Sequence, residues 1–197
     1  MTKVKKIVTW SAFPSLLLFI VFLGVNAAIT GGLGTSFFYS FFATNAAAIC
    51  VAIGVTATIL VAGTDISLGS IVSLVNVVIV TLCGKGYTVW SAALVALACA
   101  VLCGMFNGFV IGVLRVNPLL TTFATSTAFA GIALWILPNP GGSIDFIFSD
   151  WYGSRLLGII PTPVLLILVL IIIWYIMMKM PNGIHLYALG RDVNKAY

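Results

Sequence analysis

The sequence consists of long, uncharged apolar runs separated by isolated charged residues. The uncharged runs are 7–64, 66–84, 86–114, 116–144 and 156–178. Each is near or above the roughly 20 residues that a helix needs to cross the hydrocarbon core of a membrane. The first run is too long for one crossing, and the glycine-rich turn at 31–36 divides it. The pattern predicts six helices, near residues 13–33, 41–62, 66–83, 88–114, 119–137 and 161–179.

Composition supports the same class of protein. Of the 197 residues, 62% are hydrophobic and 7% are charged, whereas soluble domains carry about 25% charged residues. We therefore expect an all-α, polytopic transmembrane helical bundle of about six spans in a lipid bilayer. The net charge of +5 does not indicate nucleic acid as a partner, because the basic residues are scattered singly at the ends of apolar runs.

The basic residues also predict an orientation. An amino terminus in the cytoplasm leaves most of them inside, as the positive-inside rule requires. The inside set is Lys3, Lys5, Lys6, Arg115, Lys179, Arg191 and Lys195. Only Lys85 and Arg155 are then outside. The basic start could also open a signal peptide that ends at Val25-Asn26-Ala27, but the uncharged run continues well beyond that point.

In this orientation the largest external connection is 138–161. It holds two acids, Asp145 and Asp150, and the aromatic residues Trp151 and Tyr152. Amphipathic rings settle at membrane surfaces. We therefore expect this connection to lie at the outer surface of the membrane.

Two of the predicted helices carry small residues at every fourth position, which allows close helix contact in lipid. These positions are Ala92, Ala96, Ala100, Gly104, Gly108 and Gly112 in one helix, and Ala46, Cys50, Gly54, Thr58 and Ala62 in the other. A step of four residues advances about 40° beyond a full turn, so such a stripe winds around its helix. Both helices are expected to touch several neighbours at the centre of the bundle.

Asp65 is the only acid before residue 145. A charge at the centre of a bilayer costs roughly 2.5 kcal/mol or more, so this carboxylate must lie near an interface or be held by polar partners. The predicted topology places it at the cytoplasmic junction of the second and third helices, where burial costs least. It could line a path, hold a gate or cap the helix that follows, and the sequence leaves these roles open.

Further uncharged polar residues occur inside the apolar runs. Amides and hydroxyls form hydrogen bonds without the cost of burying a charge, so they suit a path for an uncharged polar solute such as a sugar. The candidate path or gate residues are Asp65, Ser67, Ser70, Ser73, Asn76, Asn107, Thr122 and Thr125. The competing interpretation is structural, since Ser and Thr often bond to backbone carbonyls and Asn can join two helices.

The sequence contains no arrangement typical of catalysis, metal binding or cofactor binding. All four acids are Asp, there is one His, and no Cys-x-x-Cys, His-Glu-x-x-His, Gly-x-Ser-x-Gly or nucleotide-binding loop occurs. Cys99 and Cys103 share a helix face and are expected to be small packing residues. We expect no enzyme, so energy for uphill transport would come from another subunit or from an ion gradient.

Four segments together suggest a family. Residues 62–70 read Ala-Gly-Thr-Asp-Ile-Ser-Leu-Gly-Ser. A second segment contains Asn107-Gly108 and continues to Leu-Arg-Val-Asn-Pro at 114–118. Thr122 and Thr125 follow it. The tail contains Gly183, then Tyr-Ala-Leu-Gly at 187–190, and Asp192. The chain resembles the membrane permease subunits of ABC importers for ribose and related monosaccharides. Asn117 stands where that family has Pro, and we expect it to cap a helix that begins at Pro118.

The resemblance implies how the chain would work and with which partners. Residues 1–179 would form a partial transmembrane domain, and 180–197 would begin the cytoplasmic segment that couples to the ATPase. The coupling residues would be Gly190, Arg191, Asp192, Lys195 and Ala196. The implied partners are an ABC ATPase subunit that uses ATP, an extracytoplasmic sugar-binding protein and a second permease chain, in the bacterial inner membrane. The chain itself would bind no cofactor.

Members of this family continue with several more transmembrane helices, so the chain looks like the amino-terminal part of a permease. It could be a split subunit that works with a separate chain, or a truncated remnant that folds without transporting. An ATPase-independent membrane channel is a third possibility.

Overall fold

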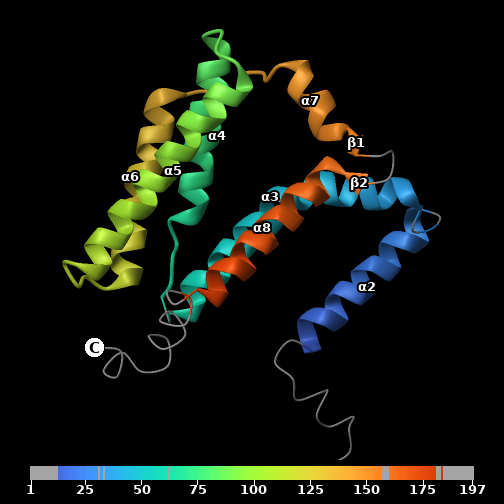
Figure 1. Cartoon of the computed structure of the whole chain (residues 1–197), viewed down its shortest axis with the longest axis horizontal. Helices are drawn as coiled ribbons and strands as arrows, with labels where there is room; N and C mark the ends of the chain where they lie inside the picture. The colour runs from blue at the N-terminus through green and yellow to red at the C-terminus, as the bar shows by residue number, and fades with distance from the viewer. Residues whose placement is uncertain are drawn as a thin grey trace, which may run out of the picture. The chain divides into compact units, whose positions relative to one another are not determined.

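The computed structural model describes residues 13–30, 32, 34–61, 63–156, 160–180 and 183. Within these residues the chain forms seven helices and one short pair of strands (Figure 1). The helices are α2 (Phe13–Thr30), α3 (Thr35–Leu60), α4 (Leu68–Gly84), α5 (Val89–Gly112), α6 (Pro118–Ile136), α7 (Phe146–Gly153) and α8 (Thr162–Lys179). The strands are β1 (Arg155–Leu156) and β2 (Ile160–Pro161), paired antiparallel.

The prediction of six long apolar helices is confirmed. Four of them, α3, α5, α6 and α8, are long and apolar enough to cross a membrane, and α2 and α4 are shorter apolar helices. The largest boundary difference is at α3, which begins at Thr35 instead of residue 41 because the Gly34 carbonyl already accepts from the amides of Phe37 and Phe38. The orientation across the membrane stays a prediction.

Two small elements were not predicted. Helix α7 has eight residues, which is too short for helical periodicity to stand out in a sequence. The β1–β2 pair joins only Arg155 to Pro161 and Leu156 to Ile160. The all-α description therefore holds for every long element, with one minimal hairpin as its exception in the described residues.

The chain divides into two parts, residues 1–42 and 43–197, and each is described by itself. In the first part, α2 is followed by a turn at Gly32, whose φ of 132° is accessible mainly to glycine. The first turns of α3 then stack aromatic rings, with Phe37 and Phe41 centroids 6.1 Å apart.

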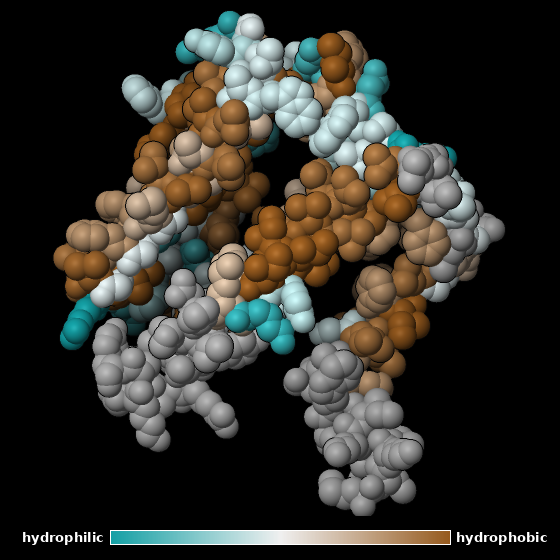
Figure 2. Space-filling view, in the orientation of Figure 1, coloured by the Kyte–Doolittle hydropathy of each residue, from teal (hydrophilic) through white to brown (hydrophobic). Residues whose placement is uncertain are grey.

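The second part contains a three-helix bundle made by α4, α5 and α6, each of which packs against the other two. Its core consists of Leu74, Cys103, Phe129 and Ala133. Cys103 is thus a packing residue, as expected, and Cys99 packs against the same core. The sides of these helices are largely apolar and exposed, as Figure 2 shows for the face in view.

The small-residue stripe of α5 divides into two halves. Ala92 and Ala96 are 0% and 1% exposed, so they meet the neighbouring helices. Gly104, Gly108 and Gly112 are exposed, and a side chain added at any of them would meet nothing within 4 Å. The drift of about 40° per step turns the second half away from the bundle, so contact with several neighbours is observed only for the first half.

Candidate functional site

Asp65 lies in a short non-helical segment between α3 and α4. The Gly63 amide donates to the Thr58 carbonyl at 3.0 Å, which closes the end of α3. One Asp65 oxygen, Oδ1, then accepts from the Ser67 amide at 2.8 Å and from the Ser67 hydroxyl at 2.6 Å. An acidic side chain that bonds two residues ahead satisfies an amide that has no partner inside the helix. Asp65 therefore forms an Asx turn that holds Ser67, the residue immediately before α4.

Ser67 also forms a hydrogen bond with α5. The side chain is fully buried, and its oxygen accepts from the Asn107 Nδ2 at 2.8 Å. A hydroxyl has a single hydrogen, and that of Ser67 is used on Asp65, so it can only accept from Asn107. The chain of hydrogen bonds therefore has one direction, from the Asn107 amide to the Ser67 hydroxyl to the Asp65 carboxylate.

Thr122 attaches the same segment to α6. Its hydroxyl oxygen accepts from the Ile66 amide at 3.2 Å and donates to the Pro118 carbonyl at 2.9 Å, with the Thr64 carbonyl next at 3.3 Å. Thr122 is 1% exposed. One hydroxyl thus serves the backbone of a segment that is 56 residues away in sequence. We call Asp65, Ser67, Asn107 and Thr122, with the backbone of 64–66, the polar junction.

The polar junction lies deeper than the neighbouring α5–α6 connection. Helix α5 continues past Asn107 to Gly112, and α6 begins at Pro118, before Thr122. At 1.5 Å per residue, the junction is about 6 to 8 Å inside the end of these two helices. The expectation that Asp65 joins the second and third helices is confirmed, but it is not at the very end of the bundle. Non-helical backbone at such depth requires protein partners, and the Thr122 hydroxyl is one of them.

The eight candidate path residues separate into two groups. Ser70 and Thr125 are buried beside the junction and donate to the carbonyls of Ser67 and Thr122, at 2.7 and 3.3 Å. Ser73 and Asn76 are exposed. Steps of three residues fall about 60° short of a full turn, so the row that starts at Ser67 leaves the bundle interior by Ser73. The coupling residues 190–196 lie outside the described residues.

Two buried polar atoms near the junction have no hydrogen-bond partner in the described part of the chain. These are the Asn107 Oδ1 and the Thr121 Oγ1, on side chains that are each 5% exposed. Thr121 is one of the uncharged polar residues inside the apolar runs but was not among the eight candidate path residues. An unmet buried acceptor costs about 1 to 3 kcal/mol, so Asn107 faces a place where a donor is expected.

The α5–α6 connection itself is built as the sequence predicts. The Asn117 Oδ1 accepts from the Leu119 amide at 2.9 Å, and Pro118 occupies the first turn of α6. Arg115 has a φ of 54°, a left-handed conformation that costs about 1 kcal/mol for a residue other than glycine. The cationic side chain is exposed at this turn.

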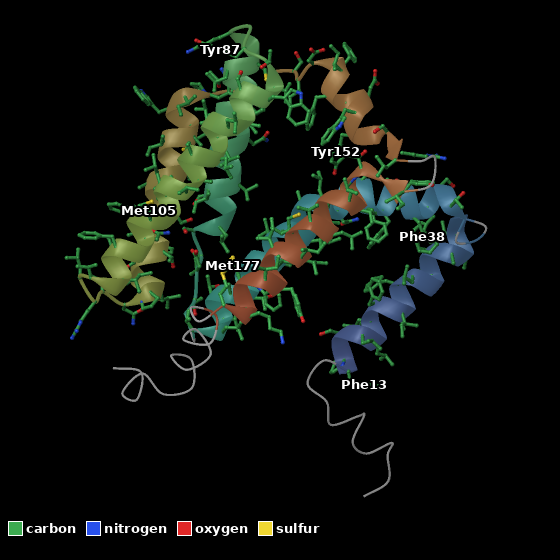
Figure 3. All side chains as sticks on the ribbon, in the orientation of Figure 1. Phe13, Phe38, Tyr87, Met105, Tyr152 and Met177 are labelled. Atoms are coloured by element: carbon green, nitrogen blue, oxygen red, sulfur yellow. The ribbon has the colours of Figure 1, made fainter. Side chains whose placement is uncertain are left out.

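At the opposite end of the bundle, aromatic rings join α5 to α7. Trp90, at the start of α5, meets Trp151 of α7 edge to face with centroids 5.0 Å apart, and Phe148 lies 5.6 Å from Trp151. The Tyr152 hydroxyl, on α7 in Figure 3, donates to the Ala43 carbonyl of α3 at 2.7 Å. We call these four side chains the aromatic cluster. Burial raises the pKa of the Tyr152 phenol, with the Cys50 thiol as a smaller cause, so it remains a donor at neutral pH.

Comparison with known proteins identifies the family. Residues 36–197 match the family described as "Branched-chain amino acid transport system / permease component". The galactofuranose transporter permease protein YtfT of Escherichia coli (strain K12) is 30% identical over 74% of this chain and 43% of its own length. The D-allose transport system permease protein AlsC of the same strain is 29% identical over 89% of this chain and 56% of its own length.

A third relative is the autoinducer 2 import system permease protein LsrD of Escherichia coli O9:H4 (strain HS), 31% identical over 72% of this chain and 45% of its own length. No solved structure matches the chain. The chain spans about half the length of these relatives. The match confirms the resemblance seen in the sequence, and the chain belongs to the permease components of this transport family.

Proposed function

We propose that this chain forms the amino-terminal part of the permease subunit of an ATP-binding-cassette importer for a monosaccharide, in the inner membrane of a bacterium. Two relatives are named for the sugars galactofuranose and D-allose, and the family description names a permease component. As a permease, the chain would provide part of the path and leave ATP hydrolysis to another subunit.

The observation that carries the proposal is the polar junction inside an otherwise apolar bundle. Its hydrogen-bond chain runs from Asn107 to Asp65, which leaves the Asn107 Oδ1 as an acceptor without a partner among the described residues. A neutral acceptor suits the hydroxyl of a sugar, because it binds a donor without the cost of a buried charge. Asp65 and Ser67 would set the direction in which the Asn107 amide faces.

Asn107 is buried in this conformation, so access to it requires the bundle to rearrange. We propose that nucleotide-driven movement of the ATPase supplies that change, as in other two-state transporters. The contact with the ATPase would begin at residues 190–197, with Gly190, Arg191, Asp192, Lys195 and Ala196 as coupling residues. An extracytoplasmic binding protein would deliver the sugar, and a second permease chain would complete the path.

Sugar uptake tests the role of the junction. In a strain that supplies the ATPase, the binding protein and the permease chain that completes the path, Ser67→Ala should reduce uptake of labelled sugar about tenfold, which corresponds to roughly 1.4 kcal/mol. Ser73→Ala is the matched control, since Ser73 is exposed on the same helix and bonds only to the Gly69 carbonyl. Uptake by the Ser67 variant at the level of the control, at equal amounts in the membrane, would remove the junction from the path.

Copurification tests the proposed coupling segment. The ATPase subunit should copurify with the complete chain and be lost after deletion of residues 190–197. Retention of the ATPase after this deletion would place the coupling contact elsewhere. Because this result does not depend on sugar binding, it separates a wrong coupling segment from a wrong path.

A further inference from the structure

Helix α7 carries both packed and exposed apolar side chains. Phe148, Trp151 and Tyr152 belong to the aromatic cluster and contact Trp90 or one another. Phe146 and Ile147 precede them and are 84% and 73% exposed. At about 100° per residue, Phe146 lies about 160° from Phe148 around the helix, and Asp150 lies only about 40° from Phe146. Helix α7 therefore packs on α5 through its rings, and two large apolar side chains in its first turn, Phe146 and Ile147, remain mostly exposed.

The position of α7 relative to the bundle is given by its ring contacts with Trp90. Trp90 lies in the first turn of α5, at the end where α4 stops and where α6 finishes (Figure 1). This end also carries Trp135, which is 84% exposed, and the exposed Tyr87 of the α4–α5 connection (Figure 3). The exposed Trp and Tyr residues of the bundle thus gather at one end of α4, α5 and α6. Trp and Tyr are enriched where a membrane meets water.

Charged residues lie close to the same end. Lys85 in the α4–α5 connection is exposed, and Asp145 and Asp150 are exposed at and within α7. The Asp145 Oδ1 accepts from the Ile147 amide at 3.2 Å and so caps the first turn of α7. Charges of both signs next to exposed aromatic rings are typical of the headgroup layer, where polar groups are still hydrated.

Gly142 holds the approach to α7 close to the bundle. It has a φ of 98°, and a Cβ at this position would collide with the Val80 side chain of α4. The connection between α6 and α7 therefore runs directly against α4. Together with the Trp90 contacts, this holds α7 at the end of the bundle.

From these observations we propose that α7 is an interfacial helix, whose first turn binds the boundary between lipid headgroups and acyl chains. Phe146 and Ile147 enter this boundary, and Asp150, one turn further along the helix, stays in the headgroup layer. The amides of Ile147, Phe148 and Ser149 at the start of α7 donate to Asp145, so the first turn can enter the interface without exposing these polar groups. The helix then sets the depth of the bundle in the bilayer, independently of which solute the chain transports.

Spin-label accessibility in vesicles of phosphatidylethanolamine and phosphatidylglycerol tests the proposal on the complete chain. With the four cysteines replaced by alanine, nitroxides are placed one at a time through Phe146→Cys, Ile147→Cys, Phe148→Cys and Asp150→Cys. Val101→Cys, exposed in the middle of α5, provides the hydrocarbon reference. Oxygen partitions into lipid and a nickel chelate stays in water, so their collision rates report depth.

We expect the ratio of oxygen to nickel collisions at 146 and 147 to exceed that at 150 by about threefold and to remain below that at 101, as an interfacial depth requires. Position 148, which is only partly exposed, should collide less often with both reagents than 146 and 147. If the cysteine replacements unfold the chain, p-benzoylphenylalanine at 146 and at 148 on the natural cysteine background gives the same distinction. A lipid adduct should then form at 146 only.

Three results would overturn the proposal. Strong nickel collisions at 146 and 147 would mean that the first turn of α7 meets water and is available to a soluble protein. Exclusion of both reagents there would mean that another protein segment or a second copy covers it. Free access to both reagents at 148 would mean that α7 does not pack on α5.

Discussion

The two ends of the α4–α5–α6 bundle make different kinds of contact. At one end, directional hydrogen bonds connect Asp65, Ser67, Asn107 and Thr122. At the other end, ring contacts join Trp90 to Phe148 and Trp151, with one hydrogen bond from Tyr152. The first end depends on donors and acceptors that match one to one, and the second on several overlapping contacts.

This difference predicts how each end responds to substitution. A hydrogen bond in an apolar interior cannot be replaced by water, so loss of one partner leaves the other unmet. Ring packing is shared among several neighbours, so loss of the Tyr152 hydroxyl alone leaves most of the ring contacts intact. The polar junction should therefore be sensitive to single atoms, and the aromatic cluster mainly to volume and backbone geometry.

The largest effect is expected from Asn107→Asp. The new carboxylate cannot donate to the Ser67 hydroxyl and would face the Asp65 carboxylate across it, so the folded chain should lose about 3 kcal/mol. The free energy of unfolding in mixed detergent micelles measures this loss. Asn117→Asp is the control, because Asn and Asp cap a helix equally well. A loss below 1 kcal/mol at position 107 would show that the junction is hydrated.

The next effect concerns the aromatic end. Gly142→Ala introduces a Cβ at a positive φ and against the Val80 side chain, and should cost about 2 kcal/mol. Gly141→Ala is a matched control one residue away, where an added Cβ meets nothing within 4 Å. The same unfolding measurement compares the two. Equal stabilities would mean that the connection to α7 does not run against α4.

Thr122→Val tests the polar junction through one hydroxyl of unchanged shape. The Ile66 amide loses its acceptor, so we expect a loss of about 1 to 2 kcal/mol. Thr127→Val in the same helix removes only a bond to the Phe123 carbonyl and should change stability little. Hydrogen exchange of the Ile66 amide should accelerate in the Thr122 variant alone. Unchanged exchange would contradict the attachment of this segment to α6.

The smallest effect is expected from Tyr152→Phe, which keeps the ring contacts and removes the bond to the Ala43 carbonyl. The loss should be about 0.5 to 1 kcal/mol, against none for the exposed Tyr87→Phe. Since burial raises the Tyr152 pKa above its ordinary 10.0, this contribution should persist below pH 10 and disappear as the pH rises through the raised pKa. A larger loss than that of Thr122→Val would reverse the comparison between the two ends.

The sequence predicted much of the site but not its arrangement. The charge-free runs indicated each long helix, and the isolated Asp65 indicated the segment that became the polar junction. Asn117 and Pro118 correctly predicted where α6 begins. The polar row from Ser67 to Asn76 was predicted to line a path as a whole. Steps of three residues rotate around a helix, so only Ser67 and Ser70 of this row face the interior. Helix α7 was too short to detect by periodicity, although Asp145 before an aromatic run is a capping signal.

The sequence by itself determined that this chain crosses a membrane and where its helices lie, because hydrocarbon admits only long uncharged segments whose backbone bonds are internal. It also determined that Asp65 needs polar partners. Only the tertiary structure decided which partners these are. Ser67 and Asn107 are 40 residues apart, and Ile66 and Thr122 are 56 apart, so no local pattern links them. Their contacts follow from how α4, α5 and α6 pack, because a hydrogen bond requires positions accurate to a fraction of an ångström.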